Sequence, residues 1–303
     1  MAEHHHDHNH DHPHAHAHAR GTPGSALRTA ALLTVGFAVV EAVGGWWTGS
    51  LALLSDAGHM LTDGAALALG AIAAWMARRP PSQQHSYGLG RAEVVAALVN
   101  AAAMLLIVLA LGYEAMIRFR HPSPVDGAAA ALIAAVGLAV NLWVMRRLAP
   151  HGHDLNTRAA RLHVLGDVLG SIAALASGAV IALSGWTPID ALASLAICGL
   201  IAVSAVRLMR ESLHALMEGV PHGLSVDAIG AGMARVDGVI SVHDLHVWTL
   251  SGSRTALSAH IVVRSLSDWH RVLADLQHQL HDDFGIDHVT LQPESSVRPL
   301  RRL

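Results

Sequence analysis

Six stretches of this 303-residue chain are each long and apolar enough to cross a lipid bilayer, and they constrain the fold more than any other feature. A transmembrane helix needs about 20 consecutive, mostly apolar residues. Runs rich in proline, glycine and arginine, such as Arg78-Arg79-Pro80-Pro81, interrupt the apolar sequence between them. The sequence predicts membrane-spanning helices at residues 27–48, 51–77, 92–117, 125–147, 160–184 and 188–209.

The composition also favours a protein that is embedded in a lipid bilayer. Hydrophobic residues make up 52% of it and charged residues only 14%, whereas a soluble domain carries about 25% charged residues. The net charge of −3 leaves no basic stripe for nucleic acid, so we expect no nucleic-acid partner. The short loops and the lack of a signal segment predict a bacterial plasma (inner) membrane.

The arginines predict the orientation of the spans, because positively charged loops stay on the cytoplasmic side. Eleven arginines near the ends of the spans would lie on one side of the membrane and two on the other. This asymmetry puts both termini in the cytoplasm, in agreement with an even number of spans. The larger set is Arg20, Arg28, Arg78, Arg79, Arg91, Arg146, Arg147, Arg158, Arg161, Arg207 and Arg210, and the smaller set is Arg118 and Arg120.

After the last span the pattern of polar and apolar residues is typical of a small soluble α+β domain. Residues 225–236 and 266–284 are predicted as helices, and 239–250, 256–263 and 288–292 as strands, in the order αββαβ. About eighty residues suffice for a small domain that pairs with a copy of itself. The predicted division is a His-rich tail at 1–26, a transmembrane domain at 27–210, the soluble domain at 211–294 and a short tail at 295–303.

Two of the predicted spans carry the same pair of ionisable residues. His59 and Asp63 are four residues apart in the second span, and His163 and Asp167 repeat that spacing in the fifth. On a helix such a pair lies on one face, one turn apart. Ionisable groups at mid-membrane cost about 2.5–3.5 kcal/mol each on insertion scales. Two imidazoles and two carboxylates facing one another suit a tetrahedral Zn2+; hydrogen bonds to neighbouring helices are the structural alternative.

The ligand chemistry also predicts an exchange of metal for protons. The single cysteine, Cys198, lies in an apolar run, so an internal disulfide is excluded and a tight site must use histidine and carboxylates. Metal binding needs neutral histidine and ionised aspartate, so protons leave as Zn2+ arrives. Because histidine titrates near neutrality, metal–proton antiport is workable at ordinary pH.

Other polar groups inside the spans are predicted to support this site or the bundle. Asp56 is one turn from the site residues, where it could orient His59. Four more groups are expected to form hydrogen bonds between helices, namely Glu41, Asn100, Asn141 and Asp190.

The first twenty residues hold nine of the 24 histidines, interspersed with aspartate, asparagine and alanine. An expression tag usually has uninterrupted histidines, so this pattern favours a native, disordered tail that collects metal. A solvated tail with no effect on transport is the alternative.

With these motifs the chain resembles the cation diffusion facilitator family, and within it the zinc-transporting branch. The resemblance covers nearly all of the chain after the His-rich tail. It is carried by GSLALLSDAGH at 49–59, YGLGRAE at 87–93, HVLGD at 163–167 and HDLHVW at 243–248. It implies a homodimer, a ferredoxin-like cytoplasmic domain and proton-coupled alternating access.

The resemblance also assigns residues. It implies that the transport site is formed by His59, Asp63, His163 and Asp167. This set of two histidines and two aspartates looks like that of the zinc transporters, since manganese relatives have Asp or Asn in place of the histidines. Export of Cd2+ or Co2+ as equal substrates stays open.

Members of the family bind regulatory zinc in the soluble domain, near positions that here are His243, His260 and Glu294. This chain has Gln292 where some relatives have histidine, so Asp287 or His288 are candidates to complete that set. His85, after the second span, is a further candidate ligand.

Other classes of function fit the sequence less well. An intramembrane metalloenzyme would need a motif such as His-Glu-x-x-His, which the chain lacks, so we expect no enzyme. A metal-gated channel is disfavoured because a tight four-ligand site slows conduction. A metal sensor anchored by its spans would not need four ionisable residues within them.

Overall fold

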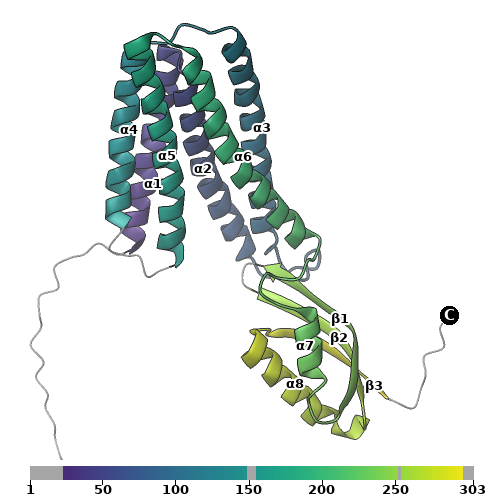
Figure 1. Cartoon of the computed structure of the whole chain (residues 1–303). Helices are drawn as coiled ribbons and strands as arrows, with labels where there is room; N and C mark the ends of the chain where they lie inside the picture. Colours follow the sequence, from purple (N-terminus) through teal and green to yellow (C-terminus); the bar gives the residue numbers. More distant parts are fainter. Residues whose placement is uncertain (1–22, 149–154, 252–253, 296–303) are drawn as a thin grey trace, which may run out of the picture.

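The computed structural model describes residues 23–148, 155–251 and 254–295. Six long helices form a bundle, and a smaller domain lies beyond one end of it, below α3 and α6 in Figure 1. Residues 1–22 of the predicted His-rich tail at 1–26, and the last residues, 296–303, lie outside the described residues. The bundle helices are α1 (Pro23–Thr48), α2 (Leu51–Ala77), α3 (Ala92–Arg120), α4 (Gly127–Leu148), α5 (Leu155–Ser184) and α6 (Pro188–Leu216).

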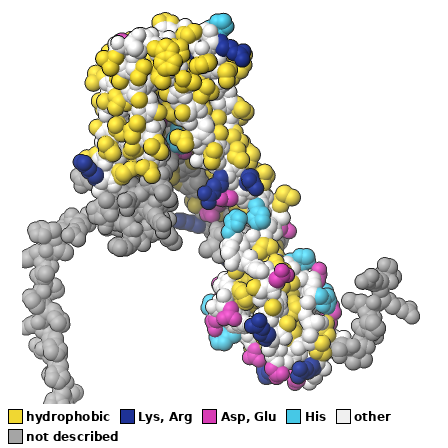
Figure 2. All heavy atoms as spheres, viewed as in Figure 1, with side chains coloured by type: hydrophobic (Ala, Val, Ile, Leu, Met, Phe, Trp, Pro, Cys, Tyr) yellow, Lys and Arg dark blue, Asp and Glu magenta, His cyan; other side chains and the backbone are white. Residues whose placement is uncertain are grey.

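The helical bundle has the surface of a membrane protein. Five helices, α2 to α6, are long and apolar enough to cross a bilayer, and α1 adds a shorter apolar stretch, Leu32–Thr48. Figure 2 shows hydrophobic side chains covering the bundle, whereas charged and histidine side chains gather on the smaller domain and near the junction. Trp46 and Leu183 are 79% and 90% exposed, which suits hydrocarbon rather than water. The prediction of a six-helix membrane domain is confirmed.

Small residues let α4 and α5 approach each other closely. A Cβ atom on Gly127 would lie 2.6 Å from the backbone nitrogen of Ala182, and one on Gly178 would lie 2.6 Å from that of Ala131. Both distances are too short for any side chain, so glycine is required at both positions. Close backbone contact of this kind is how helices pack in a bilayer, where burial of apolar surface supplies no driving force.

The N-terminus of α2 is tied to α6 by one buried carboxylate. Asp190 accepts hydrogen bonds from the Leu51 nitrogen at 2.5 Å, from the Ser50 hydroxyl at 2.7 Å and from the Ser177 hydroxyl of α5 at 3.3 Å. The first N–H groups of a helix have no partner within it and carry partial positive charge, so a carboxylate stabilises them. Asp190 thus joins α2, α5 and α6 at the end of the bundle farthest from the smaller domain (Figure 1).

The predicted hydrogen bonds between helices are confirmed in two of four cases. Asp190 of α6 accepts a hydrogen bond from the Leu51 nitrogen of α2. Asn141 of α4 donates to the Ser171 hydroxyl of α5 at 3.1 Å. Asn100 instead contacts Met104 in its own helix. The expectation for Glu41 is wrong, because neither of its carboxylate oxygens has a hydrogen-bond partner in the described part of the chain.

The smaller domain has the predicted αββαβ order. It contains a three-stranded sheet in the order β1-β2-β3, with β1 antiparallel to β2 and β2 parallel to β3. Its core packs Leu257 and Ile261 of the central strand against Leu276 and Leu280, one turn apart on α8. The elements are α7 (Val226–Met233), β1 (Val239–Ser251), β2 (Arg254–Val263), a 3-10 turn (Leu266–Asp268), α8 (Trp269–Phe284) and β3 (His288–Ser295).

The Asp190 contacts predict a large loss of stability on substitution. Hydrogen bonds to charged groups contribute about 1.5–3 kcal/mol each, so Asp190→Ala should lower the melting temperature of the detergent-purified protein strongly. Asp126 is a matched control, because its exposed carboxylate caps only the Ala129 nitrogen of α4. Asp126→Ala should cost about 1 kcal/mol. Equal shifts in scanning fluorimetry would show that Asp190 does not anchor α2.

Candidate metal centre

Helix α2 carries the first part of a polar cluster inside the bundle. His59 and Asp63 lie one helical turn apart, and His59 Nδ1 is 3.3 Å from Asp63 Oδ2. Their side chains are only 15% and 16% exposed. The i,i+4 spacing therefore presents both side chains on one face, as the sequence predicted.

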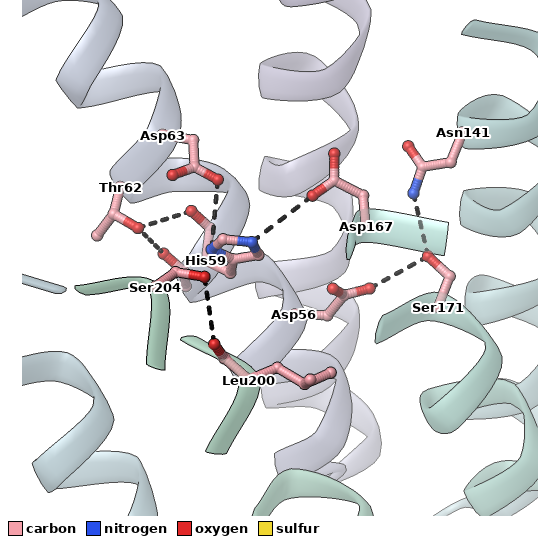
Figure 3. A network of polar contacts seen from close by, with 10 residues as sticks. Asp56, His59, Thr62, Asp63, Asn141, Asp167, Ser171, Leu200 and Ser204 are labelled. Atoms are coloured by element: carbon pink, nitrogen blue, oxygen red, sulfur yellow. Dashed lines mark hydrogen bonds and ion pairs between the residues drawn. The ribbon is translucent and has the colours of Figure 1, made fainter. Parts of the chain in front are cut away.

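Helix α5 brings a second carboxylate to the same histidine. Asp167 is fully buried, and its Oδ1 lies 3.8 Å from His59 Nε2 (Figure 3). The two ring nitrogens of His59 thus each face a carboxylate, one from its own helix and one from α5. One potential ligand atom from each of His59, Asp63 and Asp167 lies within 4.8 Å of the other two.

These separations fit a shared metal ion. Zn2+ binds nitrogen and carboxylate oxygen at about 2.0–2.2 Å, which puts neighbouring ligand atoms of a tetrahedron about 3.3–3.6 Å apart. The distances of 3.3 and 3.8 Å start from different ring nitrogens of His59, and only one of these nitrogens can bind a given ion. The support for a shared ion is therefore that one ligand atom from each residue lies within 4.8 Å of the other two. Rotation of the side chains would bring one ligand atom from each of the three residues onto one ion.

The predicted fourth ligand belongs to the same helix as Asp167. His163 lies in α5, one turn before Asp167, so the helix puts both residues on one face. The side chain of His163 falls outside the described residues. Its role as a ligand stays a prediction.

Asp56 lies beside this cluster and accepts a hydrogen bond from a residue of α5. The hydroxyl of Ser171 donates to Asp56 Oδ2 at 3.2 Å and accepts from the Asn141 amide at 3.1 Å (Figure 3). Asp56 is fully buried. These contacts join α2, α4 and α5 next to the cluster, and the predicted role of Asp56 in orienting His59 remains a prediction.

A second cluster lies on the sheet of the smaller domain. His243 and His260 are register partners on β1 and β2, and Glu294 follows on β3. Glu294 Oε1 is 2.7 Å from His260 Nδ1, and Glu294 Oε2 is 3.3 Å from His243 Nε2. The sheet therefore brings together the three residues that the resemblance assigned to this region, with ligand atoms within 4.8 Å of one another.

Asp244 adds a carboxylate that the sequence analysis missed. The register of β1 and β2 shifts between His243 and His246, and Asp244 takes a left-handed backbone with φ of 52°. This bulge places Asp244 Oδ2 3.7 Å from His260 Nε2 and Oδ1 3.0 Å from His246 Nε2. Alternation along a strand gives no sign of a bulge, so the sequence offered no signal for Asp244.

The other candidate ligands lie elsewhere. Asp287 Oδ1 is 2.6 Å from His281 Nδ1, and this hydrogen bond raises the pKa of the exposed His281. His288 packs edge-on against Tyr87, with ring centroids 6.0 Å apart. His85 lines a cavity of about 1230 Å³ between the bundle and the smaller domain, together with His246.

Comparison with known proteins identifies the family of both domains. A family model described as the cation efflux transmembrane domain matches residues 27–217, and one described as the cation efflux protein cytoplasmic domain matches residues 221–296. The zinc transporter ZitB of Escherichia coli (strain K12) is 42% identical over 269 residues, which cover 86% of this chain and 84% of that protein.

Two further relatives are similar over most of their length. The cadmium, cobalt and zinc/H(+)-K(+) antiporter of Bacillus velezensis is 38% identical over 283 residues, 91% of this chain and 90% of the relative. The metal cation efflux system protein CzcD of Cupriavidus metallidurans is 35% identical over 271 residues, 89% and 86% respectively. A solved metal-bound C-terminal domain of the CzcD transporter covers 23% of this chain and 99% of that chain, at 33% identity and a TM-score of 0.23.

The two clusters predict separable metal sites. Purified full-length protein should bind one more Zn2+ per chain than Asp63→Asn and one more than His260→Ala, because each substitution removes a ligand from a different cluster. Equilibrium dialysis with metal analysis measures the difference, and the histidines at residues 4–18 contribute equally to every variant.

His278→Ala is the control for this count. His278 is a histidine of the smaller domain with an 83% exposed side chain, and it lies in neither cluster. Its replacement should leave the stoichiometry unchanged. If His260→Ala binds as many ions as wild type, the sheet cluster holds no metal.

Proposed function

The chain belongs to the cation efflux family, the cation diffusion facilitators, and we propose that it exports a divalent metal, Zn2+ first, in exchange for protons. The observation that carries this proposal is the cluster of His59, Asp63 and Asp167 inside an apolar bundle. Ionisable residues at such a depth are costly and mark the path of an ion. The cluster draws on two helices, so a movement between α2 and α5 makes or breaks it.

The donor set supports Zn2+ as the preferred substrate. Imidazole with carboxylate suits Zn2+, whereas Mg2+ and Ca2+ favour oxygen ligands alone. The described cysteine, Cys198, lies in α6 and belongs to neither cluster. Cd2+ and Co2+ are further candidate substrates, because a relative is named for cadmium, cobalt and zinc.

Proton exchange follows from the same ligands. A bound metal requires neutral imidazole and ionised carboxylates, so its arrival displaces protons from the site. When the site opens to a more acidic compartment, protons return to the ligands and the metal leaves. The antiporter name of the relative from Bacillus velezensis supports this coupling.

The geometry supports alternating access rather than an open pore. Helix α3 packs along α6, and α4 packs along α5. Rocking of such helix groups about a central site exposes that site to one side of the membrane and then to the other. Release to the far side requires a break between the α2 and α5 ligands.

The protein is a multi-pass membrane protein, and we place it in the bacterial inner membrane with both termini and the smaller domain in the cytoplasm. The predicted arginine asymmetry supports this orientation. The match to the cytoplasmic-domain family model also supports this orientation. The same match supports a homodimer formed through the smaller domain. We keep the predicted division at residues 1–26, 27–210, 211–294 and 295–303.

The sheet cluster is proposed as a regulatory metal site. His243, His260 and Glu294 each come from a different strand, so a metal ion held by them would stiffen the domain. The His-rich tail is proposed to raise the local metal concentration. Metal sensing by the smaller domain would then regulate transport and would not be a separate function of the protein.

Metal uptake by proteoliposomes tests the proposed exchange. Vesicles that are more acidic inside than outside should accumulate Zn2+ as protons leave, with a rate that saturates. Asp63→Ala should reduce the initial rate by well over tenfold, because replacing even the groups that support a metal ligand typically costs about 10–100-fold.

Asp126→Asn is the matched control for uptake, since it changes an exposed carboxylate outside the site and should transport as wild type does. The proposal fails if Asp63→Ala transports as fast as wild type. It also fails if uptake by wild type neither responds to the pH gradient nor dissipates it.

A further inference from the structure

Glu41 is a fully buried acid that the metal cluster does not use. It lies on α1 with no exposed surface, and both carboxylate oxygens lack a hydrogen-bond partner among the described residues. An ionised carboxylate buried without a partner is very costly, and such a group instead binds a proton. The position of Glu41 therefore needs either a cation or a proton.

Gly137 of α4 leaves room for this carboxyl group. A Cβ atom on Gly137 of α4 would lie 2.5 Å from Glu41 Oε1 and 2.6 Å from the Phe37 ring. Only glycine leaves this space for Glu41. One turn further along α4, Asn141 begins the chain of hydrogen bonds to Ser171 and Asp56.

Asp56 occupies a similar niche on α2. A Cβ atom on Gly170 of α5 would overlap Asp56 Oδ1, which also has no hydrogen-bond partner in the described part of the chain. Two glycines, one on α4 and one on α5, thus make room for two buried carboxyl groups. The niche next to Gly170 is less than one turn from Asp167 along α5.

Two carboxylates on other helices would repel a negative charge on Glu41. Asp56 on α2 and Asp167 on α5 both lie within electrostatic reach of it, and from α4 its described neighbour is the uncharged Gly137. Like charges this close in a medium of low dielectric do not all ionise together. A metal ion bound at Asp167 balances the charge of that carboxylate and so removes repulsion from Glu41.

We propose that Glu41 is a proton-binding residue of the exchange, separate from the metal ligands, which is protonated when the metal cluster is empty and ionised when the cluster is loaded. The inference rests on the proposed function and identifies where one of the exchanged protons resides. In the step, the O–H bond of the Glu41 carboxyl group breaks, its electron pair stays on the carboxylate, and the proton passes to water. The metal remains on its own ligands.

The Ser171 hydroxyl and the Asp56 carboxylate lie near the level of the metal cluster along α5 and α2. Ser171 is one turn from Asp167 on α5, and Asp56 is three residues before His59 on α2. The Ser171–Asp56 hydrogen bond therefore lies between the level of the metal cluster and the end of the bundle where Asp190 caps α2.

Counting the protons released on metal binding tests this assignment. Full-length wild type in detergent is titrated with Zn2+ in weak buffer containing a pH indicator. Glu41→Gln, which has the shape of the protonated acid, should bind Zn2+ and release about one proton fewer per bound ion. Glu114→Gln is the control, because Glu114 is a partly exposed acid paired with Arg118 on α3, and it should match wild type.

Infrared difference spectra give a second readout on the unmodified protein. Addition of Zn2+ to wild type should remove intensity from the C=O stretching band of protonated carboxyl groups, and Glu41→Gln should lack that part of the change. If wild type shows no such loss, the assignment is overturned even where Glu41→Gln does not fold.

The outcomes separate the inference from the proposed function. If wild type releases protons with Zn2+ and Glu41→Gln releases equally many, Glu41 is not a proton carrier, while the antiport stands. If wild type binds Zn2+ and releases no protons at all, the antiport itself is wrong.

Discussion

Every carboxylate inside the apolar bundle needs a donor, a cation or a proton, and this constraint organises the structure. Asp190 is met by the first N–H groups of α2 and by two serine hydroxyls. Asp63 and Asp167 flank the two ring nitrogens of His59, and a metal ion bound to one nitrogen would replace the contact at that nitrogen. Glu41 has no donor in the described chain, and a proton is its remaining partner. A buried carboxylate is thus stabilised in three ways: by hydrogen-bond donors at Asp190, by a metal ion at Asp63 and Asp167, and by a proton at Glu41.

Helix α2 carries the N-terminus that Asp190 caps and two residues of the metal cluster, and its Asp56 lies within electrostatic reach of Glu41 on α1. Its N-terminus is held by Asp190, its second turn contains Asp56, and the next turns carry His59 and Asp63. Because one rigid helix carries all four contacts, a displacement of α2 relative to α5 would change the metal coordination and the environment of Asp56 together. One movement of α2 would then couple metal binding to proton binding.

The sequence predicted the parts of the site that depend on helical spacing. Six apolar stretches and two His-x-x-x-Asp pairs identify α2 and α5, since an i,i+4 pair lies on one face whatever surrounds it. The order of the smaller domain was also predictable from the alternation of its strands. Asp244 was missed because a bulge breaks that alternation. Glu41 was misread as a hydrogen-bonding group because the glycine niche on α4 exists only once the helices are packed.

X-ray absorption at the zinc edge tests the central claim most directly, that α2 and α5 together hold the metal. The sample is full-length protein with one Zn2+ per chain, carrying His260→Ala and asparagine in place of the nine histidines at residues 4–18, so that neither the tail nor an intact sheet cluster competes. The account predicts four nitrogen and oxygen ligands at about 2.0–2.2 Å, with scattering from two imidazole rings, those of His59 and His163. A shell of oxygen ligands alone, or one with a single imidazole, would contradict it.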